Sequence, residues 1–225
     1  MSKKLYDSVL RMFNPGKILA IVSVFSGIAF QAGAIPVTVQ ETGMGAHETV
    51  TMTSSTLGTH SVYAGVIDLL VNGVATDGFC IDPFHWSVKG PQPYNTEPLA
   101  SGPKSPVNGM GTASALQIEQ LWGHYYSHGM GDQNAAGLQI AIWELVGGAN
   151  FHLDSGNDYG AGVMLAWVIA HPTAPAANLI AVTGPGQDYV IPCTVPDGGQ
   201  TALLLGAGLA GLVLVRSKFA KTRAS

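Results

Sequence analysis

Residues 135–146 read Ala-Ala-Gly-Leu-Gln-Ile-Ala-Ile-Trp-Glu-Leu-Val, and their apolar periodicity predicts a helix. In this helix Gln139 lies on the same apolar face as Trp143, where a primary amide is out of place. Burying an amide without hydrogen-bond partners costs about 1–3 kcal/mol, so Gln139 requires a partner on another element. Two interpretations are open: backbone groups satisfy the amide, or a reactive side chain meets it, with Cys80 as the candidate.

The composition indicates one domain that is poor in charge. The chain has 225 residues, of which 47% are hydrophobic and 11% are charged, which is low for a soluble cytosolic protein. Eight of the 10 Lys and Arg residues lie near the two ends, so that only Lys89 and Lys104 remain between them. Against these two bases stand thirteen acids from Glu41 to Asp197, a formal charge of −11. Such a surface excludes nucleic-acid binding through phosphate neutralisation.

The N-terminal segment predicts a signal peptide over residues 1–34. A basic region precedes an apolar run at residues 18–30, and Ala32-Gly33-Ala34 then provides an A-x-A cleavage site. The mature chain is therefore expected to begin at Ile35 and to be exported, with a retained N-terminal anchor as the alternative. The basic residues of this segment are Lys3, Lys4, Arg11 and Lys17.

The C-terminal segment, residues 194–225, has three parts in a fixed order: a short motif, an apolar run at 201–215 and a basic tail. The run predicts a short transmembrane helix whose tail stays in the cytoplasm. The order also resembles the VPDSG-type relatives of the bacterial PEP-CTERM sorting signals, with Gly198 in place of the serine. This resemblance implies processing by an exosortase-type enzyme and export to the envelope or extracellular matrix; a plain membrane anchor is the alternative. The motif residues are Val195, Pro196, Asp197, Gly198 and Gly199.

The first half of the mature chain has a β pattern. Alternating or β-branched runs at 37–41, 48–53 and 61–71 predict strands. Asn72-Gly73 then predicts a type I′ hairpin turn, which is followed by a returning strand over 74–81. This strand places Cys80 near its end.

The second half of the mature chain has a mixed pattern. Residues 90–111 contain five prolines and are expected to form a connection without a regular element. Helices are predicted at 113–127 and 161–170, a polar loop at 152–158, and strands at 178–183 and 187–191. Together these predict one α+β domain over residues 35–193, with helices inserted between flanking strands.

Two short motifs in this domain match a known family. Cys80 follows Phe79 at the end of a strand, and Gln139 precedes Ala141, Ile142 and Trp143 on a helix. The pair resembles the thioester domains of Gram-positive surface adhesins, although Leu138 replaces the usual threonine. The resemblance implies a β-rich thioester-domain fold and a spontaneous cross-link between Cys80 and Gln139.

In that cross-link the Cys80 thiolate attacks the Gln139 side-chain carbonyl and expels ammonia. The resulting acyl group is stored until an amine or hydroxyl of a partner protein or polysaccharide arrives. Phe79 and Trp143 are expected to contribute to an apolar wall that limits hydrolysis. The expected function is covalent adhesion or matrix attachment by a single-use binder, without a cofactor, a metal or enzymatic turnover.

The second cysteine, Cys193, offers an alternative. A secreted chain with an even number of cysteines favours a Cys80–Cys193 disulfide. The function would then be that of a structural or carbohydrate-binding matrix protein without covalent chemistry. Tyr94, Trp86 and Trp122 are candidates for a glycan-binding groove, with core packing as the other possibility.

Two further groups of residues are candidates for a metal site and for a catalytic triad. His124 and His128 are spaced i, i+4 and could bind a metal with His152 or Asp154, but the glutamate of an H-E-x-x-H motif is missing. The other group has the residue types of a cysteine hydrolase. Neighbouring side chains on a strand point to opposite faces, so we expect no triad from it. This group consists of Cys80, Asp82 and His85.

Overall fold

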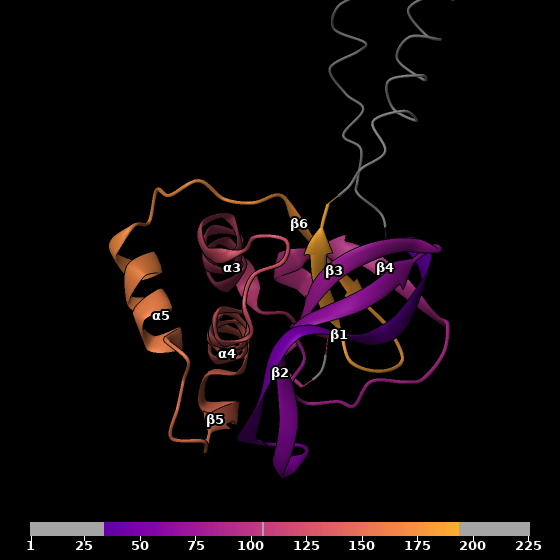
Figure 1. Ribbon diagram of the computed structural model, residues 1–225. Helices are drawn as coiled ribbons and strands as arrows, with labels where there is room; N and C mark the ends of the chain where they lie inside the picture. Colours follow the sequence, from indigo (N-terminus) through magenta and orange to yellow (C-terminus); the bar gives the residue numbers. More distant parts are fainter. Residues whose placement is uncertain (1–33, 105, 194–225) are drawn as a thin grey trace, which may run out of the picture. The chain divides into compact units, whose positions relative to one another are not determined.

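The computed structural model describes residues 34–104 and 106–193 (Figure 1). The predicted signal peptide, up to residue 33, and the predicted sorting segment 194–225 with its transmembrane helix lie outside these residues. Within them, no helix is both long and apolar enough to cross a membrane. The predicted α+β class is confirmed, because the described chain combines a seven-stranded sheet with three α-helices.

Six strands pair into a closed ring in the order β1–β2–β3–β7–β6–β4–β1, and all pairs are antiparallel. The ring closes because β1 is long enough to pair with β4 through its first residues and with β2 through the rest. The short strand β5 (Phe151–Leu153) pairs with the end of β1. The bounds of the ring strands are β1 Ile35–Ser54, β2 Gly58–Val71, β3 Val74–Cys80, β4 Gln92–Pro98, β6 Leu179–Thr183 and β7 Tyr189–Pro192.

Irregularities in β1 allow this long strand to bend around the ring. The register with β2 shifts between Glu41 and Gly43 and again between Met44 and His47, as β-bulges do. Gly65 on β2 faces the second shift, and a Cβ atom there would lie 2.2 Å from the carbonyl oxygen of Ala46. Only a glycine permits this close approach of the two backbones.

The predicted hairpin between β2 and β3 is confirmed. Asn72 and Gly73 both have positive φ angles, 51° and 81°, as a type I′ turn requires. Val71 pairs directly with Val74 across the turn. Because the turn fixes the register of β3, it also fixes the position of Cys80 at the strand's far end.

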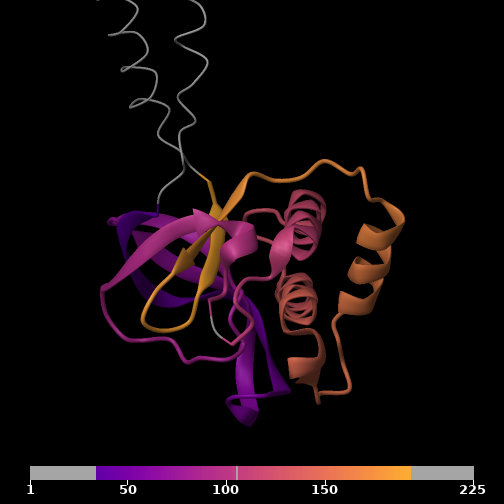
Figure 2. The same cartoon turned by 180° about the vertical axis from the view of Figure 1, so that it is seen from behind.

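The three helices lie on one side of the sheet (Figures 1 and 2). They are α3 (Gly111–Tyr125), α4 (Asp132–Gly147) and α5 (Ala161–Ala170). Helix α4 packs against β1, β2, α3 and α5, and eleven of its sixteen residues are buried. The sequence predicted burial of only one face of this helix. That prediction was too narrow, because α4 is enclosed on most of its circumference.

Two expectations for the connections were wrong. Residues 90–111 contain β4 and a short 3-10 helix at Leu99–Ser101, and the loop predicted at 152–158 begins inside β5. Proline is tolerated in β4 because of its position at the strand ends. Pro93 pairs only with β1 and Pro98 only with β6, so neither needs to donate to two neighbouring strands.

Candidate functional site

Cys80 and Gln139 meet in the interior, although they are 59 residues apart in the sequence. The last residue of β3 is Cys80, whereas Gln139 lies in the middle of α4. Each residue is only 1% exposed. The predicted partners are therefore brought together by the packing of α4 on the strand ring.

The Gln139 amide is held by the backbone of Cys80 through two reciprocal hydrogen bonds. The backbone N–H of Cys80 donates to Oε1 of Gln139 at 2.9 Å, and Nε2 of Gln139 donates to the carbonyl oxygen of Cys80 at 2.7 Å. The first interpretation of the buried amide is confirmed, because backbone groups satisfy it, and these groups belong to Cys80. Together the two bonds fix the amide plane against the backbone of Cys80.

The environment of Cys80 raises the pKa of its thiol. Its burial, followed by the negative charge of Asp82, raises its pKa well above the usual value. Two N–H groups oppose this shift. The backbone N–H of Asp82 donates to Sγ at 3.2 Å, and the indole of Trp143 also lowers the pKa of the thiol. Trp143 Nε1 has no hydrogen-bond partner among the described residues, which leaves a buried donor next to the sulfur.

The other predicted supporting residues are all buried around this pair. Ala141 and Ile142 are fully buried on α4, and Phe79 precedes Cys80 on β3. The ring of Phe79 meets the indole of Trp122 nearly edge-on, with centroids 5.2 Å apart. Trp143 lines the same cavity as Cys80, whereas Phe79 packs on Trp122.

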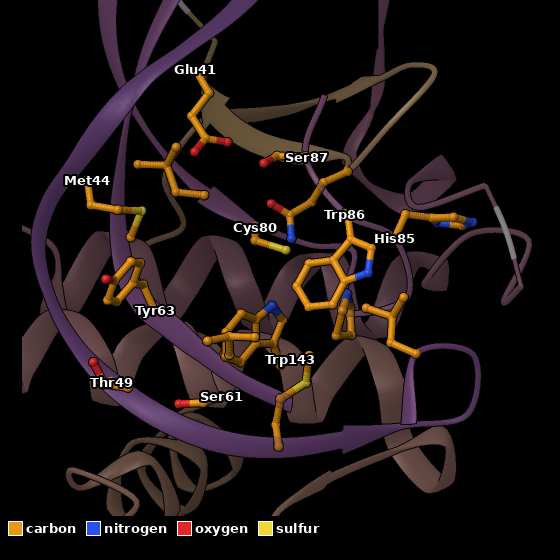
Figure 3. Close-up of a pocket in the computed structure, with 16 residues that line it drawn as sticks. Glu41, Met44, Thr49, Ser61, Tyr63, Cys80, His85, Trp86, Ser87 and Trp143 are labelled. Carbon is orange, nitrogen blue, oxygen red and sulfur yellow. The ribbon is translucent and has the colours of Figure 1, made fainter. Parts of the chain in front are cut away.

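A cavity of about 420 Å³ reaches the thiol from one side (Figure 3). Cys80 and Trp143 form its floor, whereas Gln139 does not line it. The walls come from β1, β2 and the segment 83–87, together with Gln187. A small molecule in this cavity can therefore contact Cys80.

Asp82 and His85 form a pair beside the cavity. Nδ1 of His85 lies 2.8 Å from Oδ2 of Asp82, and the backbone N–H of Phe84 donates to the other carboxylate oxygen. Burial raises the pKa of Asp82, and the pairing with His85 opposes that shift. The argument from strand alternation did not apply, because β3 ends at Cys80 and both residues lie in the following turn. In the described residues no hydrogen bond joins His85 to Cys80, so a hydrolase triad is not formed.

The alternative disulfide is wrong for this structure, in which Cys80 and Cys193 are both free. In the β3–β7 pairing Cys80 lies opposite Tyr189, and Cys193 is four residues farther along. At about 3.3 Å per residue this offset is about 13 Å. A disulfide needs Cα atoms within about 7 Å, so the register of the two strands separates the thiols.

The two histidines considered as metal ligands, His124 and His128, lie in different surroundings. Helix α3 ends at Tyr125, so His128 lies beyond it and does not share a helical face with His124. Instead, His124 stacks on Trp167 at 3.8 Å and His128 pairs with Asp77 at 2.9 Å. The residues that the structure describes contain no group of three or more ligands suited to a metal ion.

Sequence reasoning missed most of the cavity wall. Glu41 and Tyr63 line it from β1 and β2, and Glu41 accepts a hydrogen bond from Tyr189. Glu41 and Tyr189 are 148 residues apart, and no local pattern reports such a contact. Of the three aromatic residues considered for a glycan groove, Tyr94 and Trp122 are core residues and only Trp86 lines the cavity.

Comparison with known proteins gave two findings. Residues 194–219 match the family model described as the VPDSG-CTERM motif, which confirms the predicted class of sorting signal. The described fold is similar to the N-terminal thioester domain of a surface protein from Clostridium perfringens, with 14% sequence identity and a TM-score of 0.38. That alignment covers 56% of this chain and 87% of the other. A comparison with curated proteins gave no match.

Proposed function

We propose that this protein is exported to the cell surface or extracellular matrix, where a Cys80–Gln139 thioester attaches it covalently to a partner. The observation that supports this most directly is the pair of reciprocal hydrogen bonds between the Gln139 amide and the Cys80 backbone. A buried glutamine can be satisfied by many backbone groups. Here the groups belong to a cysteine whose own side chain carries the nucleophile.

Formation of the thioester requires no other reactant. The sulfur of Cys80 bonds to the side-chain carbonyl carbon of Gln139, the carbon–nitrogen bond breaks, and the thiol proton leaves with the nitrogen as ammonia. The Cys80 N–H, 2.9 Å from Oε1, is a donor for the charge that develops on that oxygen. Holding the two groups together can lower the barrier by up to about 7–11 kcal/mol relative to the separated groups.

The buried position protects the stored acyl group. Both Cys80 and Gln139 are 1% exposed, so bulk water has little access to the carbonyl carbon. The two lysines of the described chain, Lys89 and Lys104, do not line the cavity. Lys104 forms an ion pair with Glu97. Internal amines are therefore kept away from the bond that an external nucleophile would open.

Opening by a partner completes the reaction. An amine or hydroxyl forms a bond to the Gln139 carbonyl carbon, the carbon–sulfur bond breaks, and Cys80 becomes a thiol again. Trp143 Nε1–H, which is unpartnered, stabilises the departing thiolate. The product is a stable amide or ester, so each molecule acts once and is not a turnover enzyme.

The C-terminal motif supports the location of this chemistry. A sorting signal of the VPDSG-CTERM class at residues 194–219 favours export and processing by an exosortase-type enzyme. Covalent attachment through Gln139 would then link the displayed domain to protein or polysaccharide outside the cell. No cofactor enters this scheme.

The test is peptide mass mapping of the full exported chain, purified without reductant. We expect the peptides containing Cys80 and Gln139 to be joined, with a mass lower by one ammonia, and methylamine to open the link. A Cys193→Ala variant is the matched control and should keep the link, whereas Cys80→Ala should lose it. Separate peptides with an intact Gln139 amide, in protein never exposed to amines, would refute the proposal.

A further inference from the structure

The cavity above Cys80 is bordered by two exposed aromatic side chains. Tyr63 on β2 is 59% exposed and Trp86 in the segment after β3 is 51% exposed, although both line the cavity. Figure 3 shows them on either side of the Cys80 sulfur. We call these two residues the aromatic rim. It presents flat apolar surface to solvent directly at the entrance to the thiol.

Each ring of the aromatic rim is held by a histidine. His47 meets Tyr63 with ring centroids 4.7 Å apart, and His60 meets Trp86 at 5.1 Å, both in near-perpendicular arrangements. The histidines are themselves fixed, because a ring nitrogen of each lies 2.7 Å from a backbone carbonyl oxygen. Fixing the rings before a ligand arrives reduces the entropy lost on binding.

The polar side chains that line the cavity are neutral apart from one carboxylate, and they share the wall with apolar side chains such as Met44, Met52 and Ile67. Among the described residues, Glu41 is the only acid that lines the cavity, and no lysine or arginine lines it. Tyr189 donates to one oxygen of Glu41 and thereby orients the carboxylate. The remaining polar groups are hydroxyls, an amide and an imidazole, from Thr49, Ser61, Ser87, Gln187 and His85.

These features match a sugar ring. A pyranose has one apolar face, which packs on an aromatic ring, and hydroxyls around its edge that need acceptors and donors. The cavity volume of about 420 Å³ is within the range of sites that enclose small organic ligands, about 300–1,000 Å³. A lysine side chain is a narrow unbranched chain, so it would leave most of this volume unfilled.

We propose that the cavity binds a sugar residue of an extracellular polysaccharide and that a saccharide hydroxyl is the nucleophile that opens the thioester. This inference rests on the proposed thioester and names the partner's chemistry. The hydroxyl oxygen bonds to the Gln139 carbonyl carbon, the carbon–sulfur bond breaks, and the hydroxyl proton passes to the Cys80 sulfur. The result is an ester between residue 139 and the polysaccharide, with no other reactant consumed.

The test uses the full exported chain and, as the probe, the deproteinised extracellular polysaccharide of the producing bacterium. After incubation, peptide mass mapping identifies sugar attached to the peptide of Gln139, and hydroxylamine should release it as expected for an ester. In parallel, methylamine reports whether the thioester itself is present. We expect Trp86→Ala to lower the ratio of saccharide to methylamine reaction at least tenfold, and Tyr63→Ala to lower it as well.

Trp167→Ala is the matched control, because it removes an indole from α5, outside the cavity. It should leave the ratio unchanged. If methylamine opens the bond but the polysaccharide adds no sugar, or Trp86→Ala keeps the ratio, the saccharide inference is wrong while the thioester stands. Attachment to lysines of an added envelope protein extract, without sugar adducts, would likewise overturn it. Failure of the methylamine reaction itself would instead refute the proposed function.

Discussion

Gln120 on α3 and Gln139 on α4 are both buried glutamines, with 2% and 1% of their surface exposed. Gln120 donates through Nε2 to the carbonyl oxygens of Pro172 and Ala174, at 3.0 and 3.2 Å. Gln139 both donates to and accepts from the backbone of Cys80. The first amide fastens α3 to the segment after α5, and the second joins α4 to the end of β3.

The difference concerns the features on which the proposed thioester depends. Burial is common to both, so it identifies neither. Gln139 differs in that an N–H donor reaches its carbonyl oxygen and that this donor belongs to a cysteine. The proposed reaction of Gln139 therefore depends on a polarised carbonyl and on a nucleophile carried by the same neighbouring residue.

The largest effect expected from this comparison concerns the cross-link itself. Gln139→Ala should abolish both the mass deficit and the methylamine reaction, whereas Gln120→Ala should preserve both. Each variant should also lower the free energy of unfolding by about 1–3 kcal/mol, because buried backbone groups lose their partners. Peptide mass mapping and urea unfolding measure the two effects. Loss of the link in a folded Gln120→Ala variant would remove the distinction drawn between the amides.

The second prediction concerns pH, because two carboxylates are buried near Cys80. Asp82 is 1% exposed and Asp188 is 4% exposed. Burial raises the pKa of Asp188 to about 6 from 3.8, although backbone N–H groups of Gly184 and Lys104 oppose the shift. The folded state therefore binds more protons than the unfolded state between these values. The protonated Asp188 carboxyl therefore contributes its full stabilisation of the folded state below pH 3.8. This contribution is lost as the pH rises through 6.

The free energy of unfolding is expected to change by at most about 3 kcal/mol across this pH range, because the pKa of Asp188 is raised by about two. In urea unfolding at pH 4.5 and pH 7, Asp188→Asn should flatten the change in stability relative to the wild type. Glu119→Gln, next to Gln120, is the control because Glu119 is only partly buried, and its pH effect should be smaller. If Asp188→Asn loses as much stability between pH 4.5 and pH 7 as the wild type does, this carboxyl does not cause the pH dependence of stability.

Local signals explain which parts of the fold could be predicted. The Asn72-Gly73 turn, the helix at 161–170 and the strands around 179–192 depend on neighbouring residues, and the structure confirms them. Strand β4 was missed because its prolines are harmless only where one neighbouring strand is absent. That condition depends on how the ring closes, which the sequence near residues 92–98 does not encode.

The candidate site divides in the same way. Cys80 and Gln139 could be paired in advance because two short motifs carry them, and the structure brings them into contact. The cavity could not be predicted from the sequence, because its wall combines Glu41, Tyr63 and Trp86 from three separate segments. Gln120 also carried no signal, since a glutamine on a helix is ordinary until its carbonyl partners are known.

The smallest predicted effect compares two buried tryptophans, one on each glutamine-bearing helix. Trp143 Nε1 has no hydrogen-bond partner among the described residues and lies beside the Cys80 thiol, whereas Trp122 packs on Phe79. If the indole N–H stabilises the thiolate that leaves when the thioester opens, Trp143→Phe should slow the methylamine reaction about tenfold, equivalent to about 1.4 kcal/mol. Trp122→Phe, a loss of similar size in the same core, should change the rate less than twofold. Thiol release measured in a Cys193→Ala background reports Cys80 alone, and equal rates in the two variants would assign Trp143 to packing only.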